Sequence, residues 1–357
     1  MLDLKDQVSR SLSALPLAGL LATSVLKLRT SKWKKYLKVV AKAAGRGPPI
    51  AMWAITTRCN CRCYFCKVWR KPVVEPDLEY ALKTVDILHE LGCYSLSITG
   101  GEPLLYPYIT EVVNYAHEKG FIVQVNTNGS LLAENAAKIS NVDLVTISLD
   151  YPDEKHDLAR DHPHLFEKVL RGVEACRRLN LRVDFSTLLL GNQETQDLAD
   201  FAKSLNASLV LSYPEVGGSL HADSWNVPSK EWLIECFEKT LDLKEKGYPV
   251  FNTVLGLQDA IQYLTDGTRS LPCFAGESII YIDWEGWVYP CLHESKICRI
   301  ENLTDTYGTF PKFYTCTKCF DQAWLDLSAI EWALSKPRPD LAFQDLKLIT
   351  KIALQMV

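Results

Sequence analysis

Apolar and polar positions alternate with two different periods between residues 50 and 212. Short apolar runs, typical of buried strands, are separated by longer stretches in which apolar residues recur every three or four positions, as in amphipathic helices. A succession of such units predicts a parallel sheet, closed or partly closed, with helices outside it. The pattern predicts strands at 50–56, 94–98, 121–126, 144–148, 182–188 and 208–212, and helices at 78–90, 109–118, 131–139, 164–179 and 195–204.

The alternation stops after residue 213. Helices are predicted at 229–246 and 254–265, and two short apolar runs at 278–283 and 287–289 flank Glu285-Gly286, which predicts a β-hairpin. An amphipathic tail, 341–357, is expected to pack as a terminal helix. The pattern thus divides the chain into a helical leader (1–47), an α/β core (48–213), a helical connector (214–270), a small module (271–325) and C-terminal helices (326–357).

The leader is the most basic part of the chain. Its apolar stretch, 12–26, is interrupted by Pro16 and Gly19 and is shorter than the roughly 20 residues that span a bilayer. Residues 27–46 carry eight basic and no acidic side chains, and on a helical wheel the lysines lie opposite an aromatic and aliphatic face. This helix could pack on the protein's own core with its lysines in water. The absence of acidic residues favours an anionic membrane surface instead.

Composition limits the class of protein. With 47% hydrophobic and 23% charged residues in 357, the chain is expected to fold into an ordinary globular protein. A formal net charge of −4 argues against nucleic acid as a partner. The cysteines cluster at metal-ligand spacings, which predicts a reducing, cytoplasmic location, with the leader allowing peripheral contact at the inner face of the membrane.

Three cysteines after the first predicted strand have a distinctive spacing. Cys59, Cys63 and Cys66 form a C-x₃-C-x₂-C pattern. A [4Fe–4S] cluster usually takes four thiolates, so three leave one iron open to another ligand. A zinc site, or cysteines packed as small hydrophobic residues, are the alternatives. Cys61 falls outside the spacing and is not expected to be a ligand.

Three further motifs follow predicted strands: 99–103 (Thr-Gly-Gly-Glu-Pro), 126–129 (Asn-Thr-Asn-Gly) and 148–150 (Ser-Leu-Asp). The carboxyl ends of parallel strands lie at one edge of the sheet, so these loops and the cysteine loop should converge on one site. The cysteine spacing, an aromatic residue before the last cysteine and the Gly-Gly motif together resemble the radical S-adenosylmethionine (SAM) superfamily.

This resemblance implies a partial (β/α)₆ TIM-like barrel and a [4Fe–4S] cluster held by the three cysteines, whose open iron binds SAM. It also implies an electron donor such as flavodoxin or ferredoxin, and cleavage of SAM to a 5′-deoxyadenosyl radical. Glu102 would receive the methionine ammonium beside Gly100 and Gly101, and Phe65 would cover the adenine unless it is a core residue. The other SAM contacts that the resemblance implies are Asn126, Thr127, Ser148, Asp150 and Arg160, although a surface ion pair would also explain Arg160.

A second group of cysteines lies in the small module. Cys273, Gly286 and Cys291 are followed by Cys316 and Cys319 in the pattern C-x₁₂-G-x₄-C…C-x₂-C, which resembles the SPASM and twitch extensions of the superfamily. Four cysteines suffice for one fully ligated auxiliary [4Fe–4S] cluster, suited to relaying an electron. A zinc site is the alternative, and Cys298 could replace one of the four. The remaining cysteines, Cys93, Cys176 and Cys236, are expected in the core.

The predicted activity is hydrogen abstraction by a radical SAM enzyme, with no catalytic side chain assigned. The basic leader favours a lipid or isoprenoid substrate at a membrane. The alternatives are a peptide or protein maturase of the SPASM type, a small-molecule dehydrogenase, and a non-catalytic metal scaffold.

Overall fold

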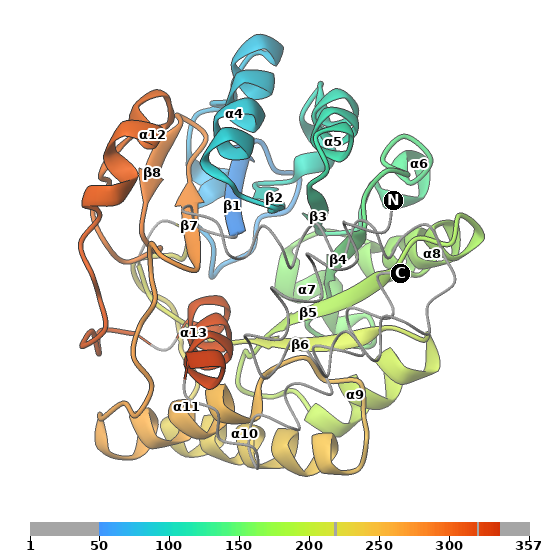
Figure 1. Ribbon diagram of the computed structural model, residues 1–357. Coiled ribbons are helices and arrows are strands. Elements are labelled where there is room, and N and C mark those ends of the chain that lie inside the picture. The colour runs from blue at the N-terminus through green and yellow to red at the C-terminus, as the bar shows by residue number, and fades with distance from the viewer. Residues whose placement is uncertain (1–49, 218–219, 320, 336–357) are drawn as a thin grey trace, which may run out of the picture.

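The computed structural model describes residues 50–217, 220–319 and 321–335 (Figure 1). The predicted leader and the amphipathic tail at 341–357 lie outside these residues. No helix in the described ranges is long and apolar enough to cross a membrane.

Six parallel strands form the centre of the fold, and they lie side by side in chain order. Trp53 and Ile98 are fully buried and represent the apolar runs that predicted these strands. The predicted α/β class is confirmed, and the barrel is partial because the sheet stays open, with β6 at one edge. The strands are β1 (Ile50–Thr56), β2 (Ser95–Gly100), β3 (Ile122–Thr127), β4 (Leu144–Ser148), β5 (Val183–Leu188) and β6 (Ser208–Ser212).

Helices connect the strands and cover the outer face of the curved sheet (Figure 1). Their apolar stripes, such as Val85 and Leu88 in α4 or Val112 in α5, are fully buried in the main core. These helices are α4 (Leu78–Leu91), α5 (Ile109–Glu118), α6 (Leu132–Asn135), α7 (Lys155–Arg160), α8 (Leu165–Arg178) and α9 (Thr195–Ser204).

The predicted helix at 131–139 is shorter than expected. Helix α6 ends at Asn135, and the chain continues to Ile139 in hydrogen-bonded turns. The Asn135 side chain donates to the Leu131 carbonyl. Such local side-chain bonds compete with helical hydrogen bonds, which explains the early end.

The distal module continues the sheet of the core. The predicted hairpin forms from β7 (Ile279–Ile282) and β8 (Trp287–Tyr289), and β9 (Cys298–Arg299) pairs with β8. Strand β7 also pairs in parallel with β1, on the side away from β2. One nine-stranded sheet therefore carries both cysteine groups.

The C-terminal helices tie the distal module to the core. Helix α10 (Lys230–Glu245) packs on α11 (Val254–Asp266), and α13 (Gln322–Ser335) lies between α11 and the β7–β8 hairpin (Figure 1). The buried Asp326 of α13 accepts hydrogen bonds from the backbone and side chain of Thr253, the N-cap of α11. The remaining short helices are α12 (Leu303–Thr306) and 3₁₀ turns at Val68–Arg70, Pro103–Leu105, Ile300–Asn302 and Tyr307–Thr309.

Candidate active site

The three predicted ligands Cys59, Cys63 and Cys66 lie together in the loop after β1. They share a small apolar cluster with Phe65 and Trp225. The loop turns on itself, because the Cys66 amide donates to the Cys63 carbonyl over 3.2 Å and the Trp69 indole donates to the same carbonyl over 3.0 Å. Three thiols on one tight, half-buried loop are the donor set that a [4Fe–4S] cluster with an open iron requires, so the residues fit such a cluster.

Cys61 is closer to this group than its spacing suggested. Its side chain is 1% exposed, and hydrogen bonds from its thiol lower the pKa of Cys59 and of Cys63. The same hydrogen bonds raise the pKa of Cys61 itself. Cys61 is therefore a thiol donor to two cysteines whose pKa it lowers.

The Gly-Gly loop lies directly on the backbone that enters the cysteine loop. The Gly101 amide donates to the Thr56 carbonyl over 2.7 Å, and a Cβ on Gly101 would lie 2.3 Å from the Arg58 carbonyl oxygen. Gly100 has a φ of +136°, which favours glycine. Only residues without a Cβ allow the two loops to approach this closely.

Glu102 is fully buried in this loop. Its carboxylate accepts hydrogen bonds from the Thr127 hydroxyl (2.7 Å), the Asn128 amide (2.7 Å) and the Leu104 amide (3.0 Å). Burial raises its pKa, and these hydrogen bonds oppose that effect. Glu102 thus fixes the loop after β3 against the loop after β2, and its contact with a methionine ammonium stays a prediction.

A second link between loops was missed by the sequence. Asn60, between two cysteines, donates to the Ser130 hydroxyl over 2.9 Å and accepts from the Asn128 side chain over 2.9 Å. In the sequence, the Asn128-Gly129 pair after a strand is typical of a turn, which by itself predicts no contact with the cysteine loop. No local pattern could have revealed this pairing, because the partners are about 70 residues apart.

Asp150 and Arg160 form a buried ion pair behind the cysteine loop. The guanidinium donates to both carboxylate oxygens over 2.8 and 3.0 Å, and lies 5.6 Å from the Phe65 ring centre. The Arg160 carbonyl accepts from the Arg62 amide over 3.1 Å. This pair, which is not on the surface, therefore orients the cysteine loop and the predicted adenine cover together.

The other predicted SAM contacts lie at the same edge of the sheet. Asn126 in β3 donates to the Ser97 hydroxyl over 2.8 Å, and Ser148 is half-buried at the end of β4. His156 is fully buried beside Asp150, and burial lowers its pKa to about 4. The four strand-end loops thus converge as expected, while the direct contacts to SAM remain predictions.

The four distal cysteines lie around the β7–β8 hairpin. Burial, followed by the neighbouring Cys316 thiol, raises the pKa of Cys273. Burial raises the pKa of Cys291 to about 12, and Cys273 contributes to this shift. Cys298 instead lies in the main core near Thr306, while Cys273 and Cys291 share a different apolar cluster. Four thiols fit an all-cysteine cluster, with Cys319 as the fourth.

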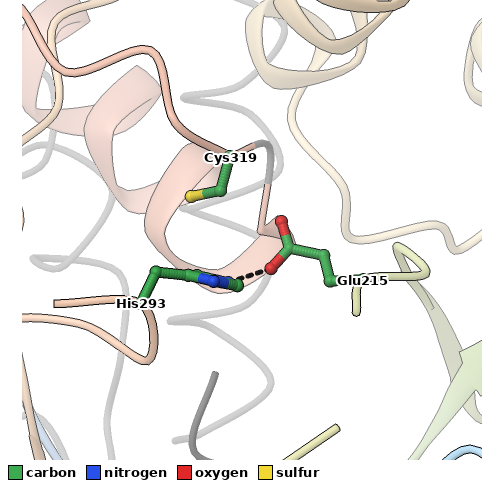
Figure 2. Close-up of side chains that lie close together, drawn as sticks. All are labelled: Glu215, His293 and Cys319. Carbon is green, nitrogen blue, oxygen red and sulfur yellow. Dashed lines mark ion pairs between the residues drawn. The ribbon is translucent and has the colours of Figure 1, made fainter. Parts of the chain in front are cut away.

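The segment after β6 connects the two cysteine groups. The Ala222 amide donates to the Phe65 carbonyl over 2.9 Å, and the Lys67 amide donates to the Leu220 carbonyl over 3.2 Å. At its start, Glu215 forms an ion pair with His293, two residues after Cys291. Figure 2 shows these two side chains converging with Cys319, and the ligand atoms of all three lie within 4.8 Å of one another.

Comparison with known proteins decides the family. Residues 53–205 match the sequence model of the radical SAM superfamily. Residues 53–205 are a radical SAM domain. Such a domain implies a [4Fe–4S] cluster and SAM at the Cys59 loop, where the residues fit them.

Radical SAM relatives of known activity are distant. AdoMet-dependent heme synthase of Methanosarcina barkeri is 25% identical over 70% of this chain and 78% of its own length. Fe-coproporphyrin III synthase of the same organism is 27% identical over 56% of this chain, and the alignment spans 54% of that protein, about half its length.

Solved radical SAM structures share the fold. Streptococcus suis SuiB bound to S-adenosylmethionine has a TM-score of 0.60 at 16% identity, covering 79% of this chain and 71% of SuiB. Native anSMEcpe with bound AdoMet and a Cp18Cys peptide has a TM-score of 0.57 at 16% identity, covering 86% of this chain and 98% of that one. At these identities the likeness establishes the fold alone.

Proposed function

We propose that this radical SAM enzyme oxidises a substrate that lies beside the segment after β6, within reach of both cysteine groups. The observation that carries the proposal is the path of that segment, which bonds to the Cys59 loop at Ala222 and meets Cys319 at Glu215. When bound, the first cluster and SAM supply a 5′-deoxyadenosyl radical that abstracts hydrogen, and an auxiliary cluster supplies an electron acceptor.

The chain's own residues orient these groups and exclude water. Arg160 and Asp150 fix the cysteine loop from behind, while Gly100 and Gly101 bring backbone close to the site of the SAM methionine. Ser148 is half-buried at a strand end, where a ribose hydroxyl could be bonded. An external donor such as flavodoxin or ferredoxin provides the initiating electron.

For the substrate we propose a lipid or isoprenoid chain at an anionic membrane surface. The support is the leader, whose residues 27–46 carry eight basic and no acidic side chains. Sedimentation with anionic liposomes tests this claim. The full chain should sediment with the vesicles and a chain beginning at Pro48 should stay in solution; equal partitioning would contradict the membrane proposal.

A peptide substrate is the second candidate. A structure of SuiB bound to its precursor peptide SuiA resembles this chain with a TM-score of 0.58. The relatives named for heme and Fe-coproporphyrin III synthesis add a tetrapyrrole as a third class to be tested. Lipids, peptides and tetrapyrroles should therefore be compared, without selection, in cells carrying the native chain or the Cys59→Ala variant. The class that changes identifies the substrate.

The chemistry itself is tested with purified protein. Anaerobic reconstitution should give about eight irons per chain, and SAM with dithionite should give 5′-deoxyadenosine. Alanine at Cys59, Cys63 or Cys66 should abolish this product, whereas Cys236→Ala, a core cysteine on α10, should retain it. SAM cleavage that survives loss of all three thiols would rule the proposal out.

A further inference from the structure

Glu215 and His293 form a carboxylate–imidazole pair at the distal cysteines that neither sequence motif explains. Their side chains are only 5% and 17% exposed. They come from different parts of the chain, since Glu215 follows β6 and His293 follows Cys291 (Figure 2). Burying charged groups is unfavourable even when they are paired, so a pair at this place calls for a role beyond stability.

The pair lies against one specific thiol. The Cys319 sulfur is within 4.8 Å of both the Glu215 carboxylate and the His293 imidazole. Cys319 belongs to the C-x₂-C pair of the proposed auxiliary cluster. Charges and hydrogen bonds near the ligand sulfurs are what proteins use to set the reduction potential of an iron–sulfur cluster.

Glu215 is one of several charged groups near this thiol, and the Arg269 guanidinium donates to the Cys319 carbonyl over 2.8 Å. Asp321 and His221 also face the pair, and both are half-buried. Among the described carboxylates, Glu215 is the one grouped with the Cys319 sulfur and the His293 imidazole within 4.8 Å. Lys318 is turned outward, where it pairs with Glu294 and is 65% exposed. The exposed lysine is screened by water, whereas the pair beside Cys319 is not.

Glu215 also belongs to the segment that is bonded to the SAM side. Its carbonyl accepts from the Trp225 indole over 2.8 Å, and Trp225 packs against Phe65 with ring centres 6.0 Å apart. The backbone that contacts the first cysteine loop therefore also places a carboxylate at the second cysteine group.

We propose that Glu215, held by His293, is a positioning residue that lowers the reduction potential of the auxiliary cluster through its carboxylate, which lies within 4.8 Å of the Cys319 sulfur. The inference rests on the proposed function, in which that cluster accepts an electron. A carboxylate near the cluster disfavours added negative charge, and His293 partly compensates it. Removing Glu215 should thus raise the reduction potential, and removing His293 should lower it.

The test uses the full chain with Cys59, Cys63 and Cys66 replaced by alanine, so that only the distal cluster is present. Redox titration followed by electron paramagnetic resonance gives its potential without any SAM chemistry. Glu215→Gln should favour the reduced form about tenfold, a rise of about 59 mV for one electron. His293→Gln should lower the potential. Glu174→Gln, which removes an exposed carboxylate on α8, should leave it unchanged.

The outcomes separate this inference from the proposed function. About four irons per chain with opposite shifts in the two variants would support it. The same iron content with unmoved potentials, or shifts of the same sign, would overturn the inference and leave the cluster in place. Absence of iron would overturn the auxiliary cluster and this inference with it. If the protein instead holds one zinc ion and the Glu215→Gln variant loses it, the inference is overturned, because Glu215, His293 and Cys319 would then bind a single metal ion.

Discussion

At the scale of single residues, the site is built from buried polar groups whose partners are other protein groups. Glu102, Asp150 and Arg160 were expected to touch SAM, and each is bonded to a neighbouring loop. Replacing these residues should therefore change the stability of the folded protein, independently of any effect on SAM binding.

Replacing Arg160 with Met should destabilise the protein by roughly 3–5 kcal/mol, because Asp150 would remain buried without its partner. The Asp150 side chain is fully buried and that of Arg160 is 12% exposed. Urea unfolding of the protein without iron measures this loss. The matched control is Arg178→Met, whose ion pair with Glu174 is exposed and should contribute less than about 1 kcal/mol. Equal losses of stability in the two variants would show that the buried Asp150–Arg160 pair contributes no more than an exposed ion pair, and would contradict the prediction.

His156 should make the fold sensitive to acid. Burial lowers its pKa to about 4 from the ordinary 6.5, although Asp150 partly opposes this shift and Arg160 adds to it. Between these pH values the unfolded chain binds a proton that the folded chain does not, so stability falls as pH decreases from 6.5 to 4. His156 should therefore reduce the free energy of unfolding by roughly 3 kcal/mol at pH 4 relative to neutral pH.

Urea unfolding at a series of pH values checks this effect. The pH dependence should be weaker in His156→Gln than in the native chain, and His162→Gln, a partly exposed site, should keep the native profile. An identical profile in His156→Gln would show that other groups cause the acid sensitivity.

At the scale of elements, the loops after β1 and β2 fit together through backbone contacts. A Cβ on Gly101 would meet backbone atoms of Arg58, which cannot move without shifting the cysteine loop. The Gly-Gly motif is thus a packing requirement of the cysteine loop as well as a ligand-facing feature.

Gly101→Ala should therefore reduce iron at the Cys59 loop and weaken SAM binding. Iron content and SAM affinity by calorimetry measure the two effects, and an affinity loss of at least tenfold, about 1.4 kcal/mol, is expected. Gly308→Ala is the control, because nothing lies within 4 Å of a Cβ at that position. Unchanged iron and SAM affinity in Gly101→Ala would mean that the loop adjusts freely.

At the scale of the whole molecule, β7 makes the distal module part of the core sheet. Ile280 of β7 pairs with Ala51 of β1, and both are fully buried. The two cysteine groups should therefore respond together when this junction is weakened.

Ile280→Ala should destabilise the fold by about 2–5 kcal/mol and speed amide exchange in both β7 and β1. Hydrogen exchange read by mass spectrometry over 50–56 and 279–282 tests this coupling. Val173→Ala on α8, far along the sheet, should affect its own helix more than β7. Faster exchange confined to β7 in Ile280→Ala would show that the module opens independently of the core.

Features that depend on neighbouring positions in the chain could be predicted from the sequence. Strand and helix periods placed β1, β4, β6 and α9, because the burial of a repeating face leaves a repeating pattern. The spacing of Cys59, Cys63 and Cys66 predicted that the three thiols lie in one loop. The parallel strand order predicted that the glycine and aspartate loops lie beside them.

Contacts between distant segments became visible only in the folded protein. Asn60 meets Asn128, β7 joins β1, and Glu215 reaches His293 and Cys319. These contacts depend on how the sheet curves and on which edge each strand adds to, and a single side chain carries no record of a partner 68 or more residues away. Each cysteine group could thus be predicted separately from the sequence. Only the fold shows that the segment after β6 hydrogen-bonds to the Cys59 loop and brings Glu215 close to Cys319.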